Sequence, residues 1–297
     1  MKKLAQLIAV PSLVLLLGAC GTADDGSEEQ DSGSTGETSE GNNEGNTSEE
    51  EETTTLTVGA TNVPHAEILE FAKDQLNEEG IELQIETFND YVLPNKALAQ
   101  EELDANYYQH IPYFEGQLED NDNYDFANAG GVHIEPIGVY SQEYDSLDEL
   151  PEGAEIIMSS SVADHGRILQ MLDEKGLITM PEDSGVDATI EDIKENPNNF
   201  TFRADVEAAV LPQAYQNGEG DAVLINSNYA IDNGLSPVDD AIALESSEDN
   251  PYVNIVAVRS EDEDKESIQT LVDVLQSDET AQFIEDEYDG AVIPAVE

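Results

Sequence analysis

Residues 56–85 read LTVGATNVPHAEILEFAKDQLNEEGIELQI, and this stretch predicts the fold. Leu56–Gly59 has the composition of a strand, and Pro64 suits the first turn of a helix. The apolar residues of that helix recur at helical spacing: Ile68, Leu69, Ala72 and Leu76. Gly80 is a typical helix terminator. The next apolar residues alternate with polar ones, as in a strand: Ile81, Leu83 and Ile85. The stretch therefore predicts strand–helix–strand.

The same alternation continues through the chain. The predicted strands are 154–158, 222–225 and 252–258. The predicted helices are 167–175, 205–216 and 264–276, of which the last is the final long helix. Alternating strands and helices are typical of parallel α/β sheets with helices on both faces. We therefore expect an α/β protein.

Ligands of α/β sheets bind beyond the carboxyl ends of the strands, often between domains. Polar and aromatic residues gather in four segments that follow predicted strands: Ala60–His65, Phe88–Pro94, Ser159–Arg167 and Asn226–Tyr229. These segments are the expected borders of a binding site.

The N-terminus has the pattern of an export signal. Lys2 and Lys3 precede the apolar run Leu4–Leu17, which is shorter than the roughly 20 residues of a membrane span. The following Leu17–Cys20 string, Leu-Gly-Ala-Cys, resembles the lipobox of lipoprotein signal peptides. Cys20 is the only cysteine, and an exported protein gains nothing from one unpaired thiol. We predict a signal peptide at 1–20 and a lipid anchor on Cys20. The alternative is an ordinary signal peptide with a chance cysteine.

Residues 21–54 are rich in Gly, Ser, Thr, Asn and acidic residues, and they contain almost no apolar ones. A segment of this composition cannot bury a core. We expect a disordered acidic linker that acts as a spacer.

The chain is strongly acidic, with 67 acidic and 10 basic residues. Twelve acids lie in the linker and two lysines in the signal, so 55–297 keeps 55 acids and 8 bases. This balance excludes nucleic acid and anionic membrane surfaces as natural partners. Adaptation to high salt, as in a halophilic or haloalkaliphilic bacterium, is the preferred explanation because salt screens the repulsion.

Several motifs, in this order, resemble the NlpA lipoprotein family, the methionine-binding lipoproteins of ABC importers. They are Gly59–Thr61 with Pro64–Leu69, Phe88–Val92 with Pro94 and Asn95, Leu103–His110 with Pro112 and Tyr113, Val132–Pro136, Gly166 and Arg167, Ile225 and Asn226 with Asn228–Ala230, and Pro251–Asn254. The resemblance extends from Leu56 to about Ala291.

The resemblance implies two α/β lobes joined by two crossover segments, with the ligand in the cleft between them. Lobe 1 is expected at 55–137 plus 252–297, and lobe 2 at 138–251. The protein is then expected to capture methionine and deliver it to an ABC permease and its ATPase. Its expected location is the extracytoplasmic face of the cell membrane, on a Gram-positive surface.

An amino-acid ligand offers a carboxylate, an ammonium group and a side chain. Arg167 matches the family motif, and an arginine fork can bind a carboxylate through two hydrogen bonds, although a surface salt bridge is the alternative. A thioether favours aromatic surface, and the residues that match family pocket positions are Tyr91, Tyr108, His110 and His133. Core packing is the alternative for Tyr108, and a structural role is the alternative for each histidine. Asn226 and Asn228 are the remaining predicted contacts, and helix capping is the alternative for Asn226.

One loop departs from the family pattern. The segment Ser159–His165 replaces an Asn-Asp-Pro-Thr-Asn-like loop, and Asp164 stands where Asn is expected. A carboxylate there either weakens the hold of Arg167 on the ligand carboxylate or helps to hold the ligand ammonium. L-Methionine is the expected ligand, and D-methionine, a methionine-containing peptide or another amino acid remain alternatives.

Other classes of protein find less support. The chain has no His-Glu-x-x-His motif, no Gly-x-Ser-x-Gly elbow and no closely spaced histidines. We therefore expect no enzymatic activity, no cofactor and no metal ligands. A metal-binding transport lipoprotein, a secreted hydrolase and an adhesive surface lipoprotein remain as alternatives.

Overall fold

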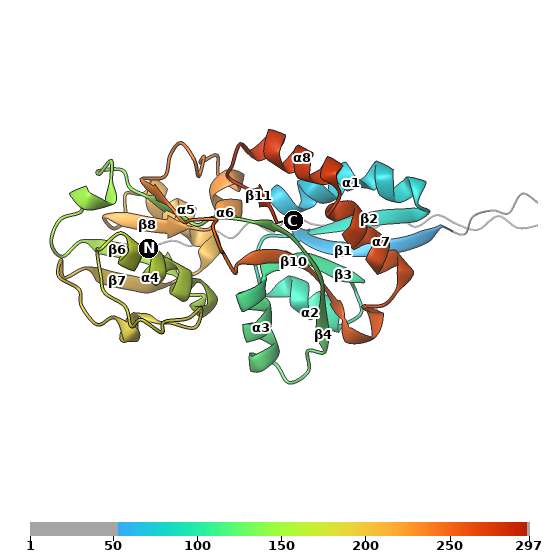
Figure 1. Cartoon of the computed structure of the whole chain (residues 1–297), viewed down its shortest axis with the longest axis horizontal. Coiled ribbons are helices and arrows are strands. Elements are labelled where there is room, and N and C mark those ends of the chain that lie inside the picture. Colours follow the sequence, from blue (N-terminus) through green and yellow to red (C-terminus); the bar gives the residue numbers. More distant parts are fainter. Residues whose placement is uncertain (1–52, 296–297) are drawn as a thin grey trace, which may run out of the picture. The chain divides into compact units, whose positions relative to one another are not determined.

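The computed structural model describes residues 53–295. The predicted signal peptide (1–20), with Cys20, and nearly all of the predicted linker (21–54) lie outside the described residues. Within 53–295, no helix is long and apolar enough to span a bilayer. The strands form two sheets, each packed with helices, so the predicted α/β class is confirmed (Figure 1).

The first sheet has the strand order β11-β4-β10-β3-β1-β2. Its elements come from both ends of the described chain: β1 (Thr54–Thr61), a π-helical turn (Asn62–Ala66), α1 (Glu67–Glu78), β2 (Ile81–Phe88), α2 (Leu93–Ala99), β3 (Ala105–His110), α3 (Ile111–Asp120), β4 (Phe126–Ile134), β10 (Val253–Arg259), a 3-10 turn (Ser260–Asp262), α7 (Glu266–Leu275), α8 (Asp278–Tyr288) and β11 (Ile293–Pro294). The predicted strand–helix–strand start corresponds to β1, α1 and β2, and the two strands pair in parallel.

Helices cover both faces of this sheet (Figure 1). On one face α1, α7 and α8 pack together, and α1 buries the four apolar residues that its spacing predicted. On the other face lie α2 and α3, whose Leu98 and Phe114 pack against Phe126 and Ile255. The carboxyl ends of β1, β2 and β3 are thereby left free to carry polar loops.

The second sheet has the order β7-β6-β8-β5-β9. Its elements are β5 (Gly138–Tyr140), β6 (Glu155–Ser159), α4 (His165–Glu174), β7 (Thr201–Val206), α5 (Leu211–Gln216), β8 (Ala222–Ile225), α6 (Ser227–Asp232) and β9 (Ala243–Leu244), with 3-10 turns at Leu147–Glu149, Val162–Asp164, Ile190–Asp192 and Ala208–Val210. Helix α4 packs on one face, and α5 and α6 pack on the other.

The chain passes between the two sheets twice, at 135–137 and at 245–252. We propose that the sheets mark the two expected lobes, with lobe 1 at 55–137 plus 252–297 and lobe 2 at 138–251.

The sheets are mixed, so the prediction of parallel sheets was wrong in part. Strand β10 runs antiparallel to both β3 and β4, and β5 runs antiparallel to β8 and β9. Strands β5 and β10 each follow a crossing between sheets, whereas β11, which pairs antiparallel with β4, does not. A crossing changes the direction in which the chain enters the next sheet. The alternation of strands and helices along the sequence does not predict this change of direction.

Two predicted helices also need correction. Residues 205–216 are not one helix, because the chain stays extended to Val206, where β7 pairs in parallel with β6. The helix begins at Leu211, with Pro212 in its first turn. The predicted final helix corresponds to α7, but α8 follows it, started by Ser277, whose side chain accepts a hydrogen bond from Thr280 N.

Candidate functional site

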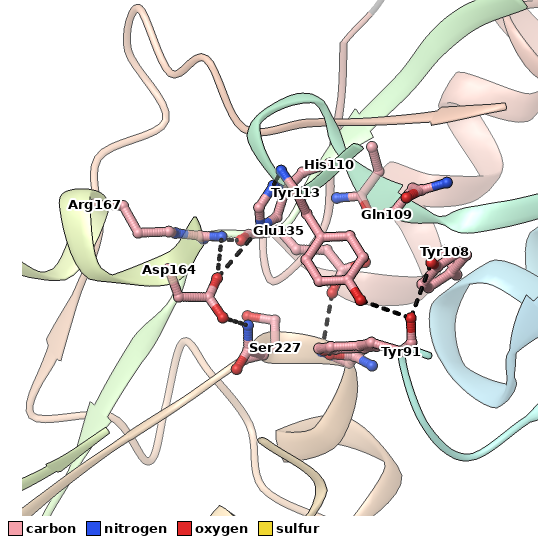
Figure 2. A pocket seen from close by; sticks show the side chains of 12 residues that line it. Tyr91, Tyr108, Gln109, His110, Tyr113, Glu135, Asp164, Arg167 and Ser227 are labelled. Atoms are coloured by element: carbon pink, nitrogen blue, oxygen red, sulfur yellow. Dashed lines mark hydrogen bonds and ion pairs between the residues drawn. The ribbon is translucent and has the colours of Figure 1, made fainter. Parts of the chain in front are cut away.

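A pocket lies where the loops of both lobes meet, with a cavity volume of about 30 Å³. Its walls come from the loop after β2, the end of β3, α3, the first crossover, α4, the start of α6 and β10. Figure 2 shows Arg167 and Asp164 on one side of it and three tyrosines on the other. The pocket therefore has a charged end and an aromatic end.

The structure brings most of the predicted site residues together. Six of them line the pocket: Tyr91, Tyr108, His110, Arg167, Asn226 and Asn228. His133 does not line it and is fully buried behind it. Three of the four predicted bordering segments contribute to the lining, whereas Ala60–His65 does not.

Asp164, which the sequence offered as a possible partner of the ligand ammonium, also lines the pocket. Five further residues line it without having been predicted as contacts: Gln109, Tyr113, Glu135, Ser227 and Asn254. Two of them carry a signal in the sequence. Glu135 immediately precedes Pro136 at the first crossover, and Asn254 is a buried polar residue in an otherwise apolar strand. A polar residue in a buried strand needs a partner, and Asn254 Oδ1 has one in His65 Nε2 at 3.1 Å.

The aromatic end is built around Tyr91. Its ring centroid lies 6.1 Å from that of Tyr108, 6.0 Å from that of Tyr113 and 5.0 Å from that of Tyr229. The hydroxyls of Tyr108 and Tyr113 both donate to the Tyr91 carbonyl, at 3.0 and 2.8 Å. The hydroxyl of Tyr91 donates to Asn228 Oδ1 of lobe 2 at 2.7 Å. These bonds hold the rings in a fixed concave surface that bridges both lobes.

Arg167 lies in the first turn of α4, directly after Gly166. A side chain at Gly166 would bring its Cβ to 2.4 Å from the Val186 carbonyl oxygen, so only glycine lets the helix start pack so closely. Arg167 is buried, and its Nε and Nη2 both donate to Glu245 Oε2, at 3.0 and 2.5 Å. Its guanidinium also lies 4.7 Å from the ring centroid of Tyr252. Burial acts to lower the pKa of Arg167, but the charges of Glu245 and Asp164 raise it above its usual value.

Asp164 lies at the end of the 3-10 turn before α4 and is 1% exposed. His110 Nε2 lies 3.3 Å from its Oδ1, and Asn226 Nδ2 donates to its Oδ2 at 3.2 Å. His110 is also the N-cap of α3, because its Nδ1 accepts from Tyr113 N. Burial acts to raise the pKa of Asp164, but the hydrogen bond from His110 and the charge of Arg167 outweigh it and lower the pKa. Asp164 is therefore a buried, ionised carboxylate.

Behind the pocket, two histidines hold Glu135. His133 Nε2 donates to Glu135 Oε1 at 2.9 Å, and His65 Nε2 lies 3.2 Å from the same oxygen. Each Nδ1 accepts from a hydroxyl, Thr61 Oγ1 for His65 and Tyr107 Oη for His133. The other carboxylate oxygen, Oε2, accepts from the backbone N–H of Asn228 in lobe 2 at 3.0 Å. The network therefore fixes Glu135 at the crossover between lobes.

His65, His133 and Glu135 are also the set of side chains among residues 53–295 whose ligand atoms are close enough to hold a metal. All three are buried, and every ring nitrogen and carboxylate oxygen already has a protein partner. A metal would have to displace these hydrogen bonds. We interpret the set as a network that positions Glu135.

The histidines make stability depend on pH. Burial lowers the pKa of His65 to about 4 and that of His133 to about 3, although Glu135 opposes the shift at His65. The folded pKa values lie below the unfolded value of about 6.5. The contribution of the two neutral histidines to the free energy of unfolding is therefore fully present above about pH 6.5, and it is lost as the pH falls toward the folded pKa values. For each histidine, the free energy of unfolding is expected to fall by about 1.4 kcal/mol for every unit by which the pH drops in this window. Burial raises the pKa of Glu135, so its protonation acts in the opposite direction.

Denaturant unfolding at about pH 6 and pH 5, in high salt to screen the surface acids, measures this slope. His133→Gln, which cannot titrate, is expected to have a shallower slope by about 1.4 kcal/mol per pH unit. Equal slopes in the two proteins would contradict the assignment of His133 as a buried neutral ring.

The sequence profile of the NlpA lipoprotein family matches residues 56–296. The chain belongs to this family. It is 50% identical over 258 residues to the methionine-binding lipoprotein MetQ of Bacillus subtilis, covering 86% of this chain and 93% of that protein. It is 36% identical to the D-methionine-binding lipoprotein MetQ of Escherichia coli, covering 75% of this chain and 80% of that protein.

A solved structure shows the same two-lobe fold. It is that of a nutrient-binding protein from Burkholderia cenocepacia bound to methionine, with 37% identity and a TM-score of 0.76. The match covers 81% of this chain and 99% of that chain. The fold expected from the family resemblance, two α/β lobes of the periplasmic-binding-protein kind, is therefore confirmed.

Proposed function

We propose that this chain is an extracytoplasmic binding lipoprotein that captures methionine for an ABC importer. The observation that carries the proposal is the two-ended pocket, with tyrosine rings at one end and Arg167, Asp164 and Asn226 at the other. A thioether gains from sulfur–ring contacts in addition to burial, and the polar end suits the charged groups of an amino acid. The binding named for the Bacillus subtilis relative, and the methionine in the Burkholderia structure, support the same ligand.

The roles of individual residues follow from their places in the pocket. Tyr91 and Tyr108 would contact the thioether, and Arg167 and Asn226 would contact the α-substituents. His110, which is bonded to Asp164, and Asn228, which accepts from the Tyr91 hydroxyl, would contact the ligand between these two ends. His133 would act through Glu135, since it does not reach the pocket itself. We further propose that the protein has no catalytic activity, in keeping with relatives that are named as binding lipoproteins.

Calorimetry with L-methionine, D-methionine and norleucine tests the proposal. Norleucine has nearly the same shape without the sulfur, so it is the matched control for the thioether. We expect L-methionine to bind tighter than norleucine and to be recovered unchanged. The names of the relatives include both methionine and D-methionine, so the same titrations decide the stereochemistry. Absence of binding by both enantiomers to the folded protein would refute the proposed ligand.

We propose that Cys20 anchors the protein to the outer face of the cell membrane, as expected from the lipobox-like sequence. Cys20→Ala is expected to release the protein into the medium or to leave an unprocessed precursor, because no lipid can then be attached. Membrane fractionation after a high-salt wash, together with the mature mass, measures this. Ser27→Ala, in the predicted linker, is the control and should remain anchored. A Cys20→Ala protein that stays on the membrane with the wild-type mass would show the anchor to be wrong.

We also propose a permease as the protein partner, docking over the mouth of the pocket. Two large apolar side chains that line the adjoining cavity, Val92 and Val162, are 49% and 55% exposed, and Leu93, next to Val92, is 50% exposed. They come from both lobes, so a partner that contacts them all would sense the distance between the lobes. Val162→Asp is expected to weaken transport while leaving methionine affinity unchanged. Unchanged transport would place the docking surface elsewhere.

A further inference from the structure

The guanidinium of Arg167 has little left to offer a ligand. Nε and Nη2 are bonded to Glu245, and Nη2 also donates to the carbonyl oxygen of Glu135 at 2.6 Å. Within the described structure, Nη1 has no hydrogen bond, and its nearest acidic oxygen is Asp164 Oδ1 at 3.8 Å. An incoming carboxylate would therefore meet one nitrogen instead of a two-pronged fork. It would also be placed beside another carboxylate.

The pocket has more negative than positive groups. Asp164 is bonded to His110 and Asn226, and His110 can donate to it as a neutral ring, because its Nδ1 accepts from Tyr113 N and leaves the proton on Nε2. Arg167 is shared between Asp164 and the closer Glu245. Glu135 is a second buried carboxylate in the pocket lining. A buried ion without a full counter-charge is costly, so a cation that binds beside Asp164 removes an existing penalty.

We infer that Asp164 binds the ligand's α-ammonium, and that the pocket recognises methionine compounds mainly through this positive charge. The inference rests on the proposed function and names its substrate class: primary amines with a methionine side chain, whether the carboxyl group is free or blocked. It assigns Asp164 as a specificity-determining residue. A compound with a blocked amine and a free carboxylate would bring a further negative charge into a pocket already lined by two carboxylates, Glu135 and Asp164.

Three compounds separate the two charges: L-methionine, L-methioninamide, which keeps only the ammonium, and N-acetyl-L-methionine, which keeps only the carboxylate. The affinities are measured by calorimetry in high salt. The salt screens the electrostatic field of the many surface acids, so contacts within the pocket determine the measured affinities. On the wild-type chain we expect methioninamide to bind within about 10-fold of methionine, and N-acetylmethionine to bind at least about 100-fold more weakly, as for loss of one partner of a buried charge pair.

Asp164→Asn keeps the shape and removes the charge. It is expected to weaken methioninamide more than methionine, by about 10-fold or more relative to each other. Asp120→Asn is the matched control, since Asp120 is exposed at the outer part of the cleft, and it should leave the ratio unchanged.

The wild-type comparison stands even if Asp164→Asn fails to fold. N-acetylmethionine binding within about 3-fold of methionine would overturn the inference, because the ammonium would then contribute less than about 0.7 kcal/mol. An unchanged ratio in a folded Asp164→Asn protein would also overturn it. If none of the three compounds binds, the proposed methionine function itself is wrong.

Discussion

Replacing Arg167 with alanine is expected to destabilise the domain by about 3–5 kcal/mol, because breaking a buried ion pair leaves its partners uncompensated. Arg167 has a side-chain exposure of 3%, and its partner Glu245 has 9%. Without the guanidinium, Glu245 and Asp164 remain as buried carboxylates with no full positive charge beside them. The cavity left by the side chain and the lost contact with Tyr252 add to the cost.

Arg203 provides the matched control. Its ion pair with Glu219 has nearly the same distance, 2.8 Å, but the two side chains are 34% and 42% exposed. Arg203→Ala is therefore expected to cost at most about 1 kcal/mol. Urea unfolding of both variants in high salt gives the two free energies. Similar values for the two would mean that Arg167 acts as a surface salt bridge, which was the alternative from the sequence.

The second large effect is expected from salt. Residues 55–297 carry 55 acids and 8 bases, and the described ion pairs engage only a few of the acids. The Debye length is about 30 Å at 0.01 M salt and about 3 Å at 1 M, so in dilute salt the acids repel one another across the whole domain. Net stability is only about 5–15 kcal/mol, and a loss of about 5 kcal/mol lowers the melting temperature of a domain this size by about 10–20 °C.

Thermal melts at pH 7 from dilute to molar NaCl measure this effect, and we expect the melting temperature to rise steeply with salt. Sucrose at matched water activity is a useful control, because it stabilises folded proteins without screening charge. In dilute salt, mild acidification should first stabilise the domain by neutralising surface acids, whereas in high salt only the loss from His65 and His133 remains. A melting temperature that does not change with NaCl would remove the basis for adaptation to high salt.

The sequence predicted well what is local in the structure. Residues 56–85 show the apolar spacing of a helix and the apolar–polar alternation of a strand, and β1, α1 and β2 lie where they were predicted. The prediction of a helix at 205–216 was wrong at its start, because residues 205 and 206 belong to β7, which pairs with β6. The direction of β10 failed for a similar reason, since it depends on a crossing more than a hundred residues after β4.

The candidate site divides in the same way. Arg167 and the pocket tyrosines could be found because they stand in strings that match a family. The occupation of Arg167 by Glu245 could not, because the two residues are 78 positions apart and meet only in the folded chain. His133 matched the family pattern equally well but lies one layer behind the pocket, and a strand residue's sequence position does not tell which layer it faces.

The place of β10 in the first sheet has a consequence for biogenesis. It lies between β3 and β4, so these two strands form no backbone hydrogen bonds with each other. Each pairs instead with β10, which is in the last fifth of the chain. The strands of the second sheet, by contrast, are all present once residue 244 has emerged. During export lobe 2 can therefore complete its sheet first, while β3 and β4 still have open edges. Unpaired strand edges are sites of aggregation, so a chain cut short before β10 should be an unusually good target for the quality-control proteases of the cell surface.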